Sequence, residues 1–292
     1  MTRLLALPSL VVVTAVWGAT FVVVKDVTEQ APPMDFLAVR FLLAAGVLAL
    51  WRPGRLLTLS RRQWANGVVM GLLLGIAYMG QTFGQQYTSA SMSGFITGMA
   101  VVFTPIIAGL LLRRRIGLST WAAVAIATAG LGIMTVRGFT IGLGEGLILL
   151  GALFFALHVV ALSEWSTAGD AYALTIVQLG VVGVLCLILG APNGLDVPGD
   201  RSFWIPVAGL AVIATAGAYL VQTWAQARLS AVVAALALTM EPVFAGVFGV
   251  LVDGDEITVR IVLGGALVVI AMAITEIRTT TPARIPEAQA EY

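Results

Sequence analysis

The sequence contains one polar pattern twice: residues 78–90 read YMGQTFGQQYTSA, and residues 219–231 read YLVQTWAQARLSA. At an offset of 141 residues the Tyr, Gln, Thr, Gln, Ser and Ala positions coincide without a gap. The same register carries Met99, Val102 and Phe103 onto Met240, Val243 and Phe244. Apolar segments often match by chance, but paired Tyr, Gln and Thr inside two such segments are harder to attribute to chance. We therefore infer that the chain consists of two related halves.

The composition around this repeat is that of a membrane protein. The 292 residues are 59% hydrophobic and only 11% charged, too few charges to cover the surface of a soluble domain. At about 20 apolar residues for each helical crossing, the chain has room for about ten. The apolar segments fall at 4–24, 34–51, 64–84, 90–112, 117–136, 144–165, 171–190, 203–226, 230–252 and 257–277.

The repeat and the segments together predict the topology. Each half holds five segments, and because five is odd, the second half must enter the membrane with the opposite orientation. We predict an all-α polytopic membrane protein with ten transmembrane helices, arranged as two inverted five-helix repeats over 1–137 and 142–278. Residues 279–292 are predicted to form a disordered cytoplasmic tail. Inverted repeats are common in secondary transporters.

Basic residues predict the orientation, because cytoplasmic loops carry an excess of Lys and Arg. With a cytoplasmic N-terminus, eleven arginines fall on the cytoplasmic side: Arg3, Arg52, Arg55, Arg61, Arg62, Arg113, Arg114, Arg115, Arg228, Arg278 and Arg284. Only Lys25, Arg137, Arg201 and Arg260 fall on the opposite side. We expect a multi-pass protein of the plasma or inner membrane, of bacterial origin, with both termini in the cytoplasm.

Several classes of function lack support in the sequence. The net charge of +1, without a basic tract interleaved with aromatic residues, gives no indication of nucleic-acid binding. A single cysteine, Cys186, lies in an apolar segment, so neither a disulfide framework nor a metal cluster is expected. The chain has no phosphate-binding Gly-Lys loop and no nucleophile elbow. We expect no catalytic residues, no metal and no cofactor.

The repeated polar residues are the first candidates for substrate binding. Tyr78 and Gln81 lie on one face of their helix, and Tyr219 and Gln222 repeat that face in the second half. Two such faces could line an aqueous cavity whose neutral donors and acceptors suit a zwitterion or a polar metabolite. Alternatively, the glutamines hold helices together across the repeat interface.

Ionisable residues inside an apolar segment are costly and suggest function. Glu241 and the sole histidine, His158, are candidates for both substrate binding and proton coupling. Pro242 removes a backbone donor next to Glu241 and, with Pro105, is a candidate hinge. Each has a structural alternative: a hydrogen-bonded neutral Glu, a packed histidine, or closely packed static helices.

Arg40 and Trp17 complete the candidate substrate-binding set. Arg40 lies inside the second apolar segment and could bind a substrate carboxylate or pair with Glu241. It could equally extend towards the headgroups or form a fixed structural pair. Trp17 could stack on a substrate or belong to the core.

Local motifs add a family resemblance. They are Trp17-Gly18-Ala19-Thr20-Phe21, Arg40-Phe41, Tyr87-Thr88-Ser89-Ala90-Ser91, Phe155-Ala156-Leu157-His158 and Met240-Glu241-Pro242-Val243-Phe244. In this order the chain resembles the EamA-type members of the drug/metabolite transporter superfamily over about 5–277. The resemblance implies a ten-helix exporter of amino acids, metabolites or drugs from the bacterial cytoplasm. The halves differ where Ala100-Val101 corresponds to Glu241-Pro242.

The sequence thus predicts a secondary transporter, not an enzyme, that exports a small-molecule solute by alternating access within the lipid bilayer. Proton coupling and the choice between monomer and homodimer stay open. The alternatives are a channel or lipid-translocating protein, a membrane structural or sensory partner and, less favoured, a multispan membrane enzyme.

Overall fold

The computed structural model describes residues 4–87, 90–113, 116–135, 142–190, 194–252 and 258–280, and every regular element in these ranges is helical. The first half contains α1 (Ala6–Thr28), α2 (Pro33–Trp51), the 3-10 helix η1 (Pro53–Thr58), α3 (Arg61–Gln85), α4 (Ala90–Gly98), α5 (Ala100–Leu112) and α6 (Leu118–Thr135). The second contains α7 (Leu143–Trp165), α8 (Ala171–Gly190), α9 (Arg201–Gly209), the π-helix η3 (Leu210–Gly217), α10 (Ala218–Gln226), α11 (Ala231–Leu238), α12 (Glu241–Val252) and α13 (Val259–Thr280).

The all-helical, polytopic part of the fold prediction is confirmed. Five described helices are long and apolar enough to cross a membrane: α2, α3, α7, α8 and the continuous helix Arg201–Gln226. Within the described residues the other apolar stretches are shorter, at Ala6–Thr20, Ile96–Leu112, Leu118–Gly130, Ala231–Phe244 and Val262–Ala271. Ten crossings therefore stay a prediction.

The helix boundaries follow the sequence repeat. The α3 and α10 helices end at Gln85 and Gln226, and α4 and α11 begin at Ala90 and Ala231, 141 residues apart in both cases. Both halves then break in the middle of an apolar segment that was predicted as one helix, at Met99 in the first half and at Thr239–Met240 in the second. Met99 and Thr239 keep backbone angles of the right-handed helical region, so each break is a local interruption of the helical hydrogen bonds.

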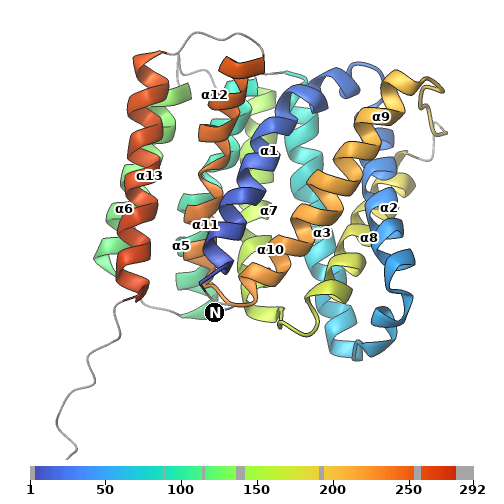
Figure 1. The fold of residues 1–292 in the computed structure, drawn as a ribbon, viewed down its shortest axis with the longest axis horizontal. Coiled ribbons are helices and arrows are strands. Elements are labelled where there is room, and N and C mark those ends of the chain that lie inside the picture. The colour runs from blue at the N-terminus through green and yellow to red at the C-terminus, as the bar shows by residue number, and fades with distance from the viewer. Residues whose placement is uncertain are drawn as a thin grey trace, which may run out of the picture.

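Equivalent helices of the two halves lie side by side (Figure 1). The α6 and α13 helices form a pair at one edge of the molecule, and α2 packs along α8 near the other edge. The α3 helix and the α9–α10 helix run in opposite directions in this view. The start of α1 and the end of α13 reach the same face. The predicted tail, beyond Thr280, lies outside the described residues.

Close helix contacts on two faces of α3 hold it at the centre of the bundle. A Cβ atom on Gly71 would lie 2.7 Å from the Gln178 carbonyl oxygen of α8. A Cβ atom on Gly80 would lie 2.7 Å from the Leu147 carbonyl oxygen of α7. Glycine is therefore required at both positions, and the resulting contacts bring the polar face of α3 close to α7 and α8.

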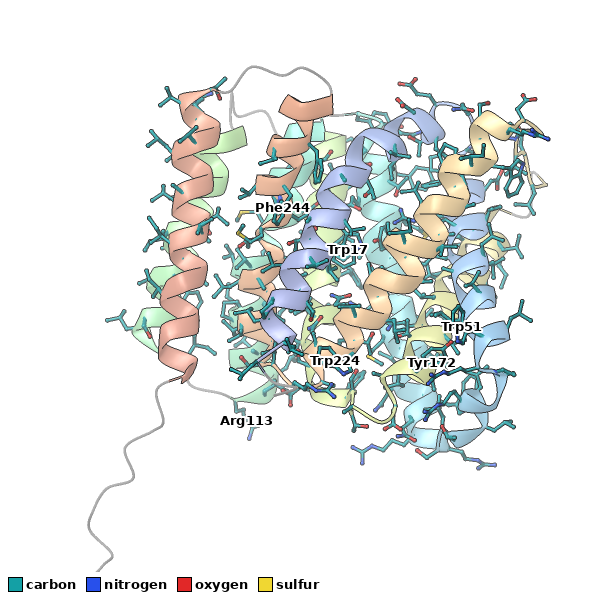
Figure 2. All side chains as sticks on the ribbon, in the orientation of Figure 1. Trp17, Trp51, Arg113, Tyr172, Trp224 and Phe244 are labelled. Atoms are coloured by element: carbon teal, nitrogen blue, oxygen red, sulfur yellow. The ribbon has the colours of Figure 1, made fainter. Side chains whose placement is uncertain are left out.

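Aromatic and basic side chains gather at the face that holds the N-terminus (Figure 2). Trp51, Tyr172, Trp224 and Arg113 all lie at this end of the molecule. The Arg228 guanidinium lies 4.3 Å from the centre of the Trp224 ring, which places another cation here. Such a belt of aromatic rings with arginines is typical of one membrane–water interface.

Candidate functional site

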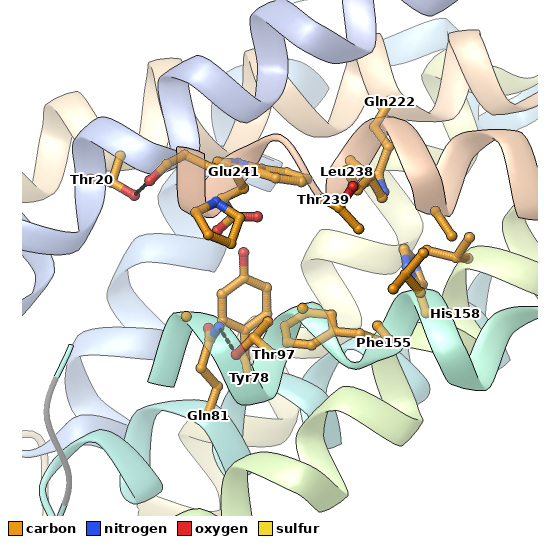
Figure 3. Close-up of a pocket in the computed structure, with 18 of the residues that line it drawn as sticks. Thr20, Tyr78, Gln81, Thr97, Phe155, His158, Gln222, Leu238, Thr239 and Glu241 are labelled. Carbon is orange, nitrogen blue, oxygen red and sulfur yellow. Dashed lines mark hydrogen bonds between the residues drawn. The ribbon is translucent and has the colours of Figure 1, made fainter. Parts of the chain in front are cut away.

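A cavity of about 100 Å³ lies between the two halves (Figure 3). All eight predicted substrate-binding residues line it: Trp17, Arg40, Tyr78, Gln81, His158, Tyr219, Gln222 and Glu241. Pro242 also lines it, whereas Pro105 lies further along α5, which continues as a helix through that residue. Since roughly 10–15 Å³ of such volume holds one water, the cavity has room for several waters or a small solute.

The two repeated tyrosines meet at the centre of this cavity wall. The Tyr219 hydroxyl donates a hydrogen bond to the Tyr78 hydroxyl at 2.8 Å, and these residues are separated by 141 positions. Residues that are equivalent in two repeats can touch only where the axis that relates the repeats passes between them. The hydroxyl pair therefore marks the place where the two halves meet.

The π-helix η3 accepts hydrogen bonds from two of the predicted residues, Trp17 and Arg40. The Trp17 indole N–H donates to the Ala214 carbonyl oxygen at 2.7 Å. The Arg40 Nε–H donates to the Thr215 hydroxyl at 2.8 Å. A carbonyl oxygen of this π-helix thus accepts a hydrogen bond from a side chain of the other half. The hydropathy pattern does not predict η3, although Pro206, just before it in α9, is a sequence signal for an irregular helix.

Arg40 and Glu241 are both in the cavity but are not paired with each other. The Arg40 guanidinium lies 5.6–5.8 Å from the ring centres of Phe36, Phe41 and Tyr78, where the aromatic faces attract a cation. In the described part of the chain, the Glu241 carboxyl has neither a hydrogen bond nor an ion pair. Figure 3 shows Glu241 on α12 and Tyr78 on α3 at opposite walls of the cavity. The carboxyl therefore remains free to bind a group within the cavity.

The two repeated glutamines differ in their partners. The Gln81 amide donates to the Thr97 hydroxyl at 3.0 Å (dashed in Figure 3). The Gln222 Oε1 atom is buried and has no hydrogen-bond partner among the described residues. A buried carbonyl oxygen without a donor costs about 1–3 kcal/mol, so a ligand or water that supplied a donor to Gln222 would be stabilised.

His158 belongs to a buried polar chain that links α7, α8 and α10. Its Nε2 atom lies 2.7 Å from Gln178 Oε1. The Gln178 Nε2–H donates to the Thr223 hydroxyl at 3.0 Å, and that hydroxyl donates to the Tyr219 carbonyl at 2.7 Å. Gln178 is not among the site residues predicted from the sequence.

A second hollow is apolar and lies between α2, α3 and α8, lined by residues such as Leu42, Val181 and Ile188. Apart from Trp64, its lining side chains are aliphatic or absent, so it offers few groups that could orient a polar solute. Within the described ranges, no three His, Cys, Asp or Glu side chains are grouped so that they could hold a metal ion. The central cavity is therefore the candidate site.

Comparison with known proteins agrees with this architecture. An "uncharacterized transporter" of Archaeoglobus fulgidus is 29% identical over 94% of this chain and 87% of its own length. The uncharacterized transporter YoaV of Bacillus subtilis is 25% identical over 88% of this chain and 91% of its own. The uncharacterized inner membrane transporter YedA of Escherichia coli K12 is 27% identical over 83% of this chain and 81% of its own.

A solved crystal structure has a similar fold, with a TM-score of 0.76 at 15% identity, over 93% of this chain and 98% of that chain. The model of the EamA-like transporter family matches residues 4–136 and 142–277, which is nearly the whole chain. The chain therefore belongs to the EamA-like transporter family of the drug/metabolite transporter superfamily and is a multi-pass membrane transporter.

Proposed function

We propose that this protein is a secondary transporter that exports a small polar solute, an amino acid or another metabolite or drug, by alternating access. The solute binds in the central cavity, between two inverted five-helix repeats that cross the membrane ten times. The observation that carries this proposal is the composition of the cavity wall: both halves contribute to it, and their equivalent tyrosines meet at 2.8 Å.

The opposite directions of α3 and α9–α10 support the inverted relation. Since these helices carry the repeated pattern, an inverted repeat requires them to be antiparallel. The aromatic and basic residues at the end that holds both α1's start and α13's end support cytoplasmic termini. In this arrangement, rocking of one half against the other would open the cavity to each side in turn.

Cysteine accessibility tests the sidedness. In a Cys186→Ala background, the substitutions Gln86→Cys and Ser230→Cys place single thiols just after α3 and α10, at exposed positions. An impermeant thiol reagent should label one from outside the cell and the other only in inverted vesicles. Labelling of both from the same side would contradict the inverted repeat and alternating access built on it.

Comparative metabolomics identifies the solute. Medium and cytoplasm of cells with and without overexpression are compared, and any solute enriched in the medium is then assayed in proteoliposomes. We expect saturable flux that competes with close analogues of the solute. Flux that rises linearly with concentration would indicate a channel instead, and an unchanged medium would contradict export.

Glu241→Gln tests whether the carboxyl carries protons. This variant keeps the shape of the side chain but removes the titrating group. If export is driven by a proton gradient through Glu241, the substitution abolishes uphill efflux in proteoliposomes while downhill exchange persists. If both persist, transport does not depend on a proton carried by Glu241.

A further inference from the structure

The orientation of the hydrogen bonds around His158 carries an inference about how the cavity recognises its solute. His158, Gln178 and Thr223 are all at most 1% exposed, so water does not replace their contacts. In such a chain every donor must face an acceptor. The donor-to-acceptor direction of every hydrogen bond in this series can therefore be derived from one group that can only accept.

That group is a backbone carbonyl. The Thr223 hydroxyl lies 2.7 Å from the Tyr219 carbonyl oxygen, which can only accept, so the single hydroxyl proton of Thr223 points there. The Thr223 oxygen is then left to accept, from the Thr175 hydroxyl at 3.1 Å and from Gln178, which presents its NH₂ group to it, 3.0 Å away. This fixes the orientation of the Gln178 amide, which places its carbonyl oxygen on the side of His158.

The orientation of the Gln178 amide in turn determines which nitrogen of His158 carries the proton. Gln178 Oε1 is an acceptor, and the His158 Nε2 atom at 2.7 Å must therefore carry the proton. In a neutral imidazole the other nitrogen, Nδ1, then has a lone pair and no proton. Among the described residues Nδ1 has no hydrogen-bond partner, while the ring lines the central cavity.

We propose that Gln178, held by Thr223, is a positioning residue that fixes His158 as its Nε2–H tautomer and so presents His158 Nδ1 as a hydrogen-bond acceptor to the solute. The unpartnered Gln222 Oε1 and Glu241 carboxyl line the same cavity. This part of the wall therefore selects a solute that carries N–H or O–H donors, such as an ammonium, amide or hydroxyl group. The selection step rests on the transport function proposed above, whereas the tautomer does not.

The sole histidine of the chain makes the tautomer directly measurable. The protein is labelled with ¹⁵N-histidine and purified through a tag without histidine, so that every imidazole signal belongs to His158. The ¹⁵N shifts, with correlations to the ring protons, show which nitrogen carries the proton. We expect Nε2–H with a bare Nδ1 at neutral pH. A dominant Nδ1–H tautomer, or an imidazolium with both nitrogens protonated, would overturn the proposal.

Variants of Thr223 test the origin of that preference. Thr223→Val removes the acceptor that orients the amide, and we expect a mixture of tautomers. Thr223→Ser keeps the hydroxyl and should keep the wild-type spectrum. The matched control is Thr82→Val at the equivalent position of the first half, which should leave the spectrum unchanged. If Thr223→Val also leaves it unchanged, Gln178 is not oriented by Thr223 and the proposal fails.

Transport kinetics test the consequence for the solute. For the solute identified by metabolomics, Gln178→Met should raise KM roughly two- to tenfold, the effect of one weakened hydrogen bond, with kcat little changed. The thermal midpoint of Gln178→Met is measured as well. A lowered midpoint would indicate that Gln178 has a structural role, whereas an unchanged midpoint with a raised KM indicates a positioning role. An unchanged KM in folded Gln178→Met would refute the selection step, whereas the wild-type spectrum reports on the tautomer even if no solute is exported.

Discussion

The helix α3 and the helix α9–η3–α10 carry the same polar pattern, but they are built differently. The first is an unbroken α-helix from Arg61 to Gln85, while the second contains a π-helix from Leu210 to Gly217. The π-helix accepts hydrogen bonds from Trp17 and Arg40. The position equivalent to Thr215, which binds Arg40, is Leu74 in α3, and a leucine has no such group.

The same contrast explains the two glutamines. Gln81 donates to Thr97, which occupies the last full turn of α4. The residue 141 positions after Thr97 is Leu238, which also lines the cavity but has no hydroxyl. Gln222 consequently lacks the hydroxyl that accepts from the Gln81 amide, and its own Oε1 atom is also unsatisfied among the described residues.

Other equivalent pairs differ in the same way. His158 corresponds to Trp17, and Glu241 corresponds to Ala100, at the same offset. All four line the cavity. The repeat thus determines where side chains are placed, and the departures from it determine the charges and free hydrogen-bonding groups. An asymmetric lining of this kind can distinguish the two ends of an asymmetric solute.

The largest effect is expected when Glu241 is replaced by alanine, the residue at the equivalent position, Ala100, of the first half. In Glu241→Ala the cavity loses its carboxyl, which makes no hydrogen bond in the described residues, so the fold should be retained. We expect the transport efficiency to fall about ten- to a hundredfold, the effect of one charged hydrogen bond to the solute. Initial rates of efflux from proteoliposomes measure it.

Glu29→Ala is the matched control, because this carboxylate is exposed and is not part of the cavity lining. Its transport rate should equal that of the wild type. Equal rates for Glu241→Ala and Glu29→Ala would show that the asymmetry at position 241 has no role in binding.

The next effect concerns the π-helix. Thr215→Val keeps the shape of the side chain but leaves the Arg40 Nε–H without its acceptor at 2.8 Å. We expect the free energy of unfolding to fall by about 1.5–3 kcal/mol, because the donor is a buried charged group. Denaturant unfolding in detergent micelles measures it. Thr14→Val is the control: Thr14 is also buried, but its hydroxyl contacts only the Val11 carbonyl in its own helix. Equal losses in both variants would mean that Arg40 does not depend on η3.

Sequence reasoning could predict the helices and the residues of the cavity for one physical reason: polar groups in apolar segments must face one another or water. Tyr78, Gln81, Tyr219 and Gln222 were found in this way, and the structure places all four around one cavity. The family membership and the all-helical fold were predicted correctly. Whether the residues bind a solute stays a prediction.

The partners of these residues could not be predicted, because they depend on local backbone geometry. The π-helix is defined by backbone hydrogen bonds between residues i and i+5. Neither the hydropathy pattern nor the sequence repeat predicts where this hydrogen-bond spacing occurs. The helix breaks were also missed, since residues 90–112 and 230–252 each form one apolar segment long enough for a single helix, despite the few polar residues within them. The role of Gln178 could not be predicted, because its contact with His158 joins α7 to α8, and only the packing of these two helices brings the side chains together.

A smaller effect should separate the two glutamines. Gln81→Met removes the hydrogen bond to Thr97 and should destabilise the protein by about 0.5–1.5 kcal/mol. Gln222→Met removes an unsatisfied buried oxygen, so its stability should be unchanged or higher, while transport of a donor-bearing solute falls. Thermal midpoints and efflux rates of the two variants, measured in parallel, give the comparison. Equal destabilisation of both would indicate that Gln222 has a partner as strong as Thr97.

The smallest effect tests the explanation of that asymmetry. Leu238→Thr introduces the hydroxyl that Thr97 provides in the first half, but it also removes apolar contacts, so its own stability is not informative. A double-mutant cycle with Gln222→Met cancels the apolar loss and isolates the new contact. We expect a favourable coupling of about 0.5–1 kcal/mol between Thr at 238 and Gln222, measured from unfolding midpoints. A coupling of zero would mean that the two halves differ in backbone position as well as in side chains, because the same pair of residues at the same offset would then fail to meet.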